Sequence, residues 1–227
     1  MNREICLRCR RPKASCLCPT MPPMETRSHI ALLMHPKEYR RQRTGTGRLA
    51  CLNLANSEII PGIAFDGHPR VRELVDDPSN YPVLLYPSPG AINLSASGFG
   101  YAGDACVAGN SPEAARFAAQ LRRRRLVVFL VDSTWACSRA VLRASPVIAR
   151  LPRLQFQPRE LSRWVIKRQP RDYCLSTIEA IHELLCALEA AGLDAYPDKR
   201  RLLEAFAAMQ DYQIERAAAA GSPRYGG

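Results

Sequence analysis

Four cysteines near the N-terminus have the residue type and the spacing of metal ligands. Cys6 and Cys9 form a C-x-x-C pair, and Cys16 and Cys18 form a C-x-C pair after six intervening residues. Two close pairs of thiolates match the tetrahedral coordination of a structural zinc ion, which leaves no open position for a substrate. Residues 1–26 have little to pack, so a bound ion would supply their folding energy. We therefore predict a zinc knuckle; the alternative is four unrelated thiols in a disordered arm.

Asp132 is the second residue whose position suggests chemistry. It follows the apolar run 126–131 and precedes Ser133, Thr134 and Trp135. A continuously apolar run is typical of a strand covered on both faces, and ligands of parallel sheets bind beyond the carboxyl ends of the strands. A carboxylate there is a candidate general base, with the cap of the following helix as the alternative. Trp135 is a candidate stacking surface for a base, with core packing as the alternative.

The chain is strongly basic. Its 227 residues include 32 Lys and Arg against 21 Asp and Glu, which gives a formal net charge of +11. Such an excess indicates a polyanionic partner, and nucleic acid is the commonest soluble one; a solvated basic surface is the alternative. A run of arginines at 122–125 adds to this charge. The candidate RNA contacts are Arg8, Arg10, Arg11, Lys13, His35, Lys37, Arg43, Arg48 and Arg168.

A glycine-rich stretch, RTGTGRLA at 43–50, leads into a predicted helix. Backbone amides at such a helix start can hold an anion. The stretch has neither the lysine of a P-loop nor the glycine spacing of a dinucleotide-binding loop. By itself it therefore indicates only a phosphate-binding surface or a solvated charged loop.

The composition also bears on the compartment. No apolar run reaches membrane-spanning length, and the charged N-terminal stretch does not resemble a signal peptide. Nine cysteines, an odd number, are typical of cytosolic thiols and metal ligands rather than of a disulfide framework. We therefore expect a cytoplasmic protein without a membrane partner.

Alternating strands and helices must position Asp132. Apolar runs predict strands over 28–34, 81–88 and 126–131; PRLQF at 152–156 is a further candidate strand, and a loop is expected over 98–110. Helical patterns are expected from near Gly47, over 111–125 with Ser111 as cap, after Trp135, over 175–192 and from about Lys199. In the clearest helix, Ser176 and Glu179 have capping-box spacing and Gly192 suits the far end. The alternation predicts an α/β domain with a largely parallel sheet.

The ordered set of these motifs resembles the DTW-domain family, the tRNA-uridine aminocarboxypropyltransferases. The shared stretches are the cysteine spacing, HPKE, TGTGRLA, LLYPS, DSTW, SPVIARLPRL and RQP…CLSTIEA, from Cys6 to about residue 215. Gly45 stands where the family pattern has Asn, so any ligand contact of that side chain is lost. Three segments are therefore predicted: the knuckle over 1–26, a catalytic DTW domain over 27–215 and a flexible tail over 216–227.

The resemblance implies a fold similar to the trefoil-knotted SPOUT methyltransferases and S-adenosylmethionine as donor. It also implies transfer of the 3-amino-3-carboxypropyl group to N3 of a tRNA uridine, with 5′-methylthioadenosine released. Asp132 would be the general base, and Trp135 would stack on the uracil or close the donor pocket. The alternatives are a SPOUT-like RNA methyltransferase and a non-enzymatic, zinc-dependent RNA-binding protein; the oligomeric state stays open.

The candidate donor-binding residues come from three stretches around the expected crevice. The LLYPS stretch is assigned to the adenosine, and the start of the 175–192 helix to the amino-acid end, with Glu179 for its ammonium. These candidates are Leu85, Tyr86, Pro87, Ser88, Ser133, Thr134, Leu175, Ser176, Thr177 and Glu179.

Overall fold

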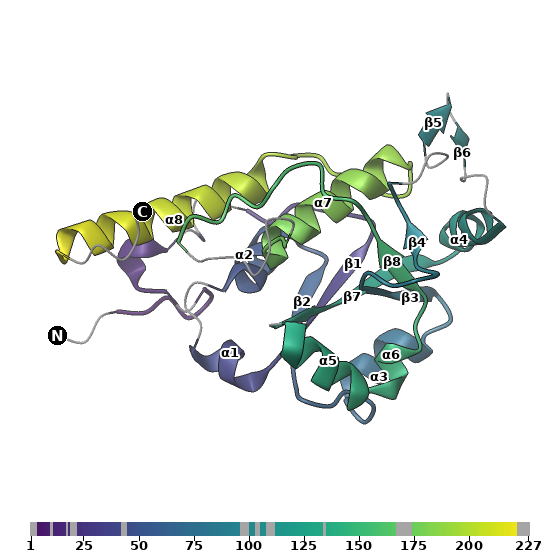
Figure 1. Cartoon of the computed structure of the whole chain (residues 1–227), viewed down its shortest axis with the longest axis horizontal. Helices are drawn as coiled ribbons and strands as arrows, with labels where there is room; N and C mark the ends of the chain where they lie inside the picture. Colours follow the sequence, from purple (N-terminus) through teal and green to yellow (C-terminus); the bar gives the residue numbers. More distant parts are fainter. Residues whose placement is uncertain are drawn as a thin grey trace.

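A six-stranded parallel sheet forms the centre of the protein in this computed structural model (Figure 1). The structure describes residues 4–9, 11–16, 18, 22–41, 45–95, 100–102, 105–107, 112–133, 135–166 and 174–221. The strand order is β2-β1-β7-β3-β8-β4, and every pairing in the sheet is parallel. The strands are β1 (His29–Met34), β2 (Ser57–Pro61), β3 (Asn80–Leu85), β4 (Ile92–Asn93), β7 (Arg125–Asp132) and β8 (Arg153–Gln155). The predicted α/β class with a parallel sheet is confirmed.

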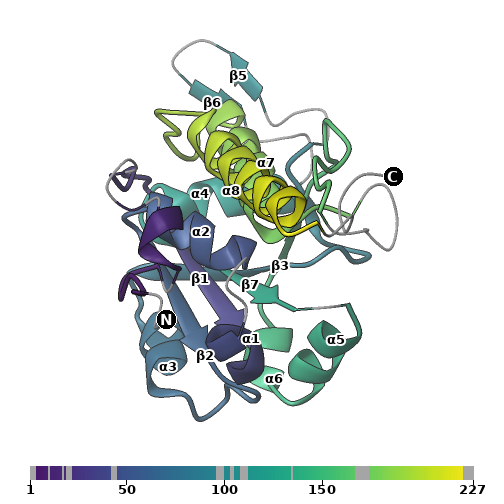
Figure 2. The same ribbon diagram turned by 90° about the vertical axis from the view of Figure 1, so that its left-hand side faces the viewer.

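Helices cover both faces of this sheet (Figures 1 and 2). One layer contains α2, α7 and α8, which contact one another, and the opposite layer contains α3, α5 and α6. The helices are α1 (Pro36–Arg41), α2 (Thr46–Asn53), α3 (Pro69–Asp76), α4 (Pro112–Leu121), α5 (Trp135–Arg143), α6 (Pro146–Ala149), α7 (Thr177–Ala190) and α8 (Arg201–Ala219), with a 3₁₀ turn at Lys13–Ser15. Among the described residues, no helix has both the length and the apolar character needed to cross a bilayer.

The central strand β7 explains why its sequence is continuously apolar. Leu126, Val128 and Leu130 pack into the core beneath α2, α7 and α8. Val127 and Phe129 pack into the core beneath α3, α5 and α6. Since side chains of a strand alternate between the two faces, the even-numbered residues of β7 face the α2–α7 layer. The side chain that ends the strand, at position 132, belongs to this even-numbered set.

Several elements differ from the sequence-based expectations. The expected loop over 98–110 contains an antiparallel pair, β5 (Gly100–Ala102) and β6 (Ala105–Val107). Helix α8 continues to Ala219, so its last turn lies within the segment predicted as a flexible tail. The elements β2, β4, α1, α3 and α6 were not predicted, because each is short and buries few side chains. The predicted cap Ser111 lies outside the described residues, and the trefoil knot stays a prediction.

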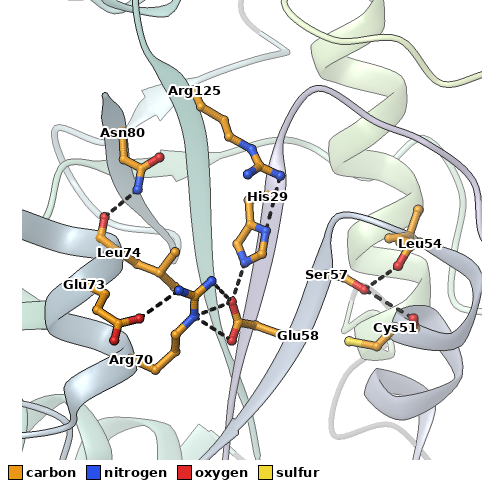
Figure 3. A network of polar contacts seen from close by, with 10 residues as sticks. All are labelled: His29, Cys51, Leu54, Ser57, Glu58, Arg70, Glu73, Leu74, Asn80 and Arg125. Atoms are coloured by element: carbon orange, nitrogen blue, oxygen red, sulfur yellow. Dashed lines mark hydrogen bonds and ion pairs between the residues drawn. The ribbon is translucent and has the colours of Figure 1, made fainter. Parts of the chain in front are cut away.

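A polar network ties together the elements at the amino edge of the sheet (Figure 3). Nε2 of His29, the first residue of β1, lies 2.7 Å from Glu58 of β2. The guanidinium of Arg70 on α3 donates to both carboxylate oxygens of Glu58 and to Glu73. Burial raises the pKa of Glu58, but the hydrogen bonds from His29 and Arg70 outweigh it and hold this pKa at about 2. Glu58 is therefore ionised at neutral pH and holds β1, β2 and α3 together.

Candidate active site and metal centre

A cavity of about 340 Å³ opens at the carboxyl edge of the sheet. It lies where the neighbouring strands β3, β7 and β8 end, beside the first turn of α7 and beside α5. Its walls are largely apolar, with Leu130, Leu154 and Phe156 among them. A mostly apolar hollow with a few polar groups, at the ends of parallel strands, is the usual place for a ligand in this class of fold.

The cavity brings together most of the residues predicted to bind the donor. Six of them line it, namely Leu85, Tyr86, Pro87, Ser133, Leu175 and Thr177. Ser88 is described and does not line it. Thr134 and the side chain of Trp135 lie outside the described residues. The stretches LLYPS, DSTW and CLST, far apart in the chain, therefore meet at one place.

The predicted role of Glu179 in binding the donor is not supported. Its carboxylate accepts hydrogen bonds from the backbone N–H and hydroxyl of Ser176, at 2.8 and 2.6 Å. It also accepts from the Ser162 hydroxyl at 2.8 Å and the Arg163 N–H at 2.6 Å. Glu179 is 4% exposed and Ser176 is 5% exposed. The pair forms the predicted capping box of α7, which is confirmed, and we assign both residues to the fold rather than to the donor.

Asp132 lies between the starts of two helices. The hydroxyl of Thr177, the first residue of α7, donates to Oδ1 of Asp132 at 2.6 Å. On the other side, a Cβ placed on Gly47 of α2 would lie 2.2 Å from Oδ2 of Asp132. The amino ends of both helices carry partial positive charge, which favours a carboxylate at this point. Helix α5 begins at Trp135, three positions after Asp132, so Asp132 does not directly precede it.

The cavity also includes residues that the sequence did not indicate. Oγ of Ser133 lies 3.0 Å from Oγ of Ser138, which comes from α5. Gln155 and Phe156 enter at the end of β8, and Cys174 precedes α7. Gln155 and Phe156 reach the cavity because the strand order places β8 beside β3. The signal available in the sequence was the stretch PRLQF at 152–156, which predicted a strand without its neighbour.

The four N-terminal cysteines form one cluster. Their Sγ atoms all lie within 4.8 Å of one another, and those of Cys9 and Cys16 are 3.7 Å apart. In a tetrahedral site with Zn–S bonds of about 2.3 Å, two sulfurs are about 3.8 Å apart. The backbone N–H of Cys9, with the neighbouring thiols, lowers the pKa of Cys6 to about 6. Burial and the adjacent thiols raise the pKa of Cys18 to about 12, which a bound cation would reverse. The predicted ligand set therefore comes together as a potential metal site.

A sequence profile of the DTW domain matches residues 3–214. The chain belongs to this family. Curated relatives include tRNA-uridine aminocarboxypropyltransferase 2 of Drosophila melanogaster, 27% identical over 96% of this chain and 78% of that protein. The protein of the same name in Mus musculus is 27% identical over 96% of this chain and 66% of its own length. The Arabidopsis thaliana tRNA-uridine aminocarboxypropyltransferase A is 26% identical over 93% of this chain and 81% of its own length. No solved structure matched the chain.

Two of the predicted RNA contacts are buried in this DTW domain. Arg11 is 7% exposed and lies beside the cysteine cluster. Burial lowers its pKa, although Cys9, Cys18 and Cys16 oppose this shift. Arg48 is 8% exposed, donates to the Tyr39 carbonyl at 2.8 Å and lies 4.8 Å above the Tyr39 ring. Both guanidinium groups therefore serve the fold, and their prediction as RNA contacts is not supported.

Of the other predicted RNA contacts, the structure describes the side chains of Arg8, Lys13 and His35. Arg8 and Lys13 are exposed, and Lys13 forms an ion pair with Glu4 at 2.9 Å. His35 is half-buried just after β1. Arg10, Arg43, Arg168 and the side chain of Lys37 lie outside the described residues.

Proposed function

We propose that this DTW-domain protein transfers the 3-amino-3-carboxypropyl group of S-adenosylmethionine to N3 of a uridine in tRNA, releasing 5′-methylthioadenosine. One observation carries the proposal most directly. The Asp132 carboxylate of the DSTW motif accepts a hydrogen bond from Thr177 and lies close against Gly47, next to Ser133, which lines a largely apolar cavity at the strand ends. The curated relatives that bear this enzyme name support the same reaction.

The reaction needs a base and a well-oriented donor. The N3–H of uridine is a poor nucleophile, so a carboxylate such as that of Asp132 removes its proton as N3 attacks. The new N3–C bond forms at the methylene bonded to the sulfonium, and the C–S bond breaks with its electron pair on sulfur. The leaving thioether is neutral. Because a methyl carbon is bonded to the same sulfur, the orientation of the donor decides which group is transferred.

The cavity fits such a donor in size and character. Its volume and its apolar walls are typical of small-molecule sites. The adenosine is assigned to the wall formed by Leu85, Tyr86 and Pro87, which agrees with the prediction for this stretch. The amino-acid end is assigned to the start of α7, where the partial positive charge of the helix end favours a carboxylate. Glu179 takes no part, because its oxygens are already bonded.

The by-product of the reaction tests the proposal directly. The purified full chain is incubated with S-adenosylmethionine and tRNA, and the small molecules and the digested nucleosides are analysed by mass spectrometry. We expect 5′-methylthioadenosine and an aminocarboxypropyl-uridine in equal amounts. S-adenosylhomocysteine would instead indicate a methyltransferase, and neither product would indicate an RNA-binding protein without this activity.

We further propose that the cysteine cluster holds zinc as a structural ion. The close approach of the four Sγ atoms supports a tetrahedral site, and the surrounding segment has little apolar material of its own. Arg201 of α8 donates a hydrogen bond to the Pro22 carbonyl, which ties the segment to the domain. A thiolate site of this kind requires reduced cysteines, which supports the cytoplasm as the proposed location.

Metal analysis tests the zinc proposal. The purified protein is expected to contain about one equivalent of zinc, since four sulfur ligands complete one site. Cys9→Ser should lose the metal and expose the N-terminal segment to limited proteolysis, because the ion supplies the folding energy there. Cys137→Ser, an exposed thiol on α5, is the matched control and should keep the metal. A Cys9→Ser protein that keeps a full equivalent of zinc would refute the site.

A further inference from the structure

A second cavity, of about 260 Å³, lies at the edge of the sheet opposite the proposed active site. It opens where β1 and β7 begin and where α4 and α7 end. Arginines dominate its polar lining, in contrast to the apolar walls of the first cavity. The polar lining consists of Arg27, Ser28, Arg122, Arg124 and Arg125.

The four guanidinium groups around this cavity carry uncompensated charge. Within the described part of the chain, none of them forms an ion pair with an Asp or Glu side chain. Nη2 of Arg125 instead lies 3.4 Å from Nδ1 of His29. Figure 3 marks this contact with a dashed line. The contact of this arginine in Figure 3 is therefore a histidine ring and not a carboxylate.

Two carboxylates near the cavity are already engaged elsewhere. Asp194 accepts hydrogen bonds from the backbone N–H groups of Arg27 and Ser28, at 2.6 and 3.0 Å. Glu58 is held by His29 and by the bidentate contact with Arg70. Both acids therefore stabilise the backbone and the strand starts, and the arginine side chains remain available to an anion.

Ser28 provides an independent sign of a missing partner. It is 1% exposed and lines the cavity. Its N–H donates to Asp194 and its carbonyl accepts from the Thr26 hydroxyl at 2.9 Å. Its own Oγ has no hydrogen-bond partner among the described residues. Buried hydroxyls are nearly always bonded, so this hydroxyl is open to an acceptor that enters the cavity.

We propose that this cavity binds a phosphate group of the RNA backbone. Guanidinium groups and a hydroxyl are donors that suit the oxygens of a phosphate, and the chain is strongly basic. The carboxyl-terminal ends of α4 and α7 also lie at the cavity, and such helix ends carry partial negative charge. The alternative role of the arginines is therefore to neutralise these two helix ends. The partnerless Ser28 Oγ favours the ligand, because a hydroxyl donor does not neutralise a helix end.

RNA is chosen as the source of the phosphate because the proposed function acts on tRNA, so this part of the proposal rests on that function. Strand β7 runs from Arg125 at this cavity to Asp132 beside the active site. At about 3.3 Å per residue, its two ends lie about 23 Å apart. A phosphate held here is therefore several nucleotides away from the reacting base. It contributes to the affinity for tRNA and takes no part in proton transfer.

Binding of a tRNA transcript to the full chain, without donor, tests the cavity. The double variant Arg27→Gln/Arg124→Gln should bind tRNA more weakly, and the log–log salt slope should fall in magnitude by about 0.7–0.9 for each phosphate that is no longer neutralised. Ser28→Ala should weaken binding about tenfold without loss of thermal stability, because its Oγ makes no bond within the described residues. Arg116→Gln is the matched control: it removes one exposed arginine of α4 outside the cavity.

The outcomes separate the cavity from the proposed reaction. If the cavity variants bind tRNA with the same affinity and salt slope as Arg116→Gln, the proposal that the cavity binds a phosphate is overturned, whether or not the protein transfers the aminocarboxypropyl group. A wild-type protein that releases no 5′-methylthioadenosine, while the cavity variants still lose tRNA affinity, would overturn the reaction alone. Inorganic phosphate serves as the small probe. Inorganic phosphate could raise the melting temperature of the wild type but not of the double variant, while both proteins bind tRNA equally well. The cavity would then bind free phosphate, and the proposal that it binds a phosphate of RNA would be refuted.

Discussion

Asp132→Asn is expected to slow the transfer step by about 10²–10⁴-fold while the fold is retained. The amide keeps the size of the side chain and an oxygen that accepts the Thr177 hydroxyl, which now bonds Oδ1 at 2.6 Å. It cannot take up the N3 proton at neutral pH. Single-turnover rates with saturating tRNA and donor measure the step, and equilibrium binding of each ligand should change far less.

The control for this change is Asp76→Asn. Asp76 is an exposed carboxylate on α3 whose contact is an ion pair with Arg72 at 3.6 Å, so its loss should leave the rate unchanged. If Asp132→Asn transfers at the wild-type rate, the carboxylate only joins the starts of α2 and α7, and the base must be sought elsewhere. Equal losses of rate and of tRNA affinity would point to a binding role.

Gly47→Ala is expected to be nearly as damaging, although it adds a single carbon. The new Cβ would lie 2.2 Å from Oδ2 and 2.9 Å from Cγ of Asp132, and 3.0 Å from Cδ1 of Leu32. Leu32 is fully buried, so the carboxylate must move. A base misplaced by about 1 Å can cost about 10²-fold in rate, and overpacking of this kind costs about 1–3 kcal/mol in stability. Single-turnover assays and urea unfolding measure the two effects.

A double variant and a control identify the cause. If Gly47→Ala acts through the carboxylate, then Gly47→Ala/Asp132→Asn should transfer no more slowly than Asp132→Asn alone. Gly67→Ala is the matched control, because a Cβ at Gly67 meets nothing within 4 Å. Additive losses in the double variant would show that Gly47 acts on the fold and not on Asp132.

The parts of the site that the sequence predicted are those encoded in local patterns. The apolar run before Asp132 indicated a doubly covered strand, and the spacing of Ser176 and Glu179 indicated the start of α7. Both elements bring their ends to the cavity, as expected. The predicted donor contact of Glu179 is not supported, because spacing alone does not reveal that its carboxylate already accepts hydrogen bonds from Ser162, Arg163 and Ser176.

Features that depend on contacts between distant segments were not predictable. The approach of Gly47 to Asp132 joins a glycine-rich stretch to a strand end 85 positions away, which the sequence does not reveal. Arg11 and Arg48 count toward the net charge, although both are buried against neighbours that only the fold supplies. The antiparallel pair β5–β6 has strands of three residues each, which are too short for a periodic signal.

Strand β7 fixes the distance between the two proposed RNA contacts. Its middle residues are buried in the core on both faces of the sheet, which holds the strand in one extended conformation. Its two ends are Arg125 and Asp132, so the distance between them is constant. With an RNA phosphate bound at the first end and chemistry at the second, the enzyme measures the separation between a backbone contact and a uridine. Selectivity would then reside in the three-dimensional shape of the substrate. Short uridine-containing oligonucleotides that cannot span the strand would be poor substrates even when their base fits the active site.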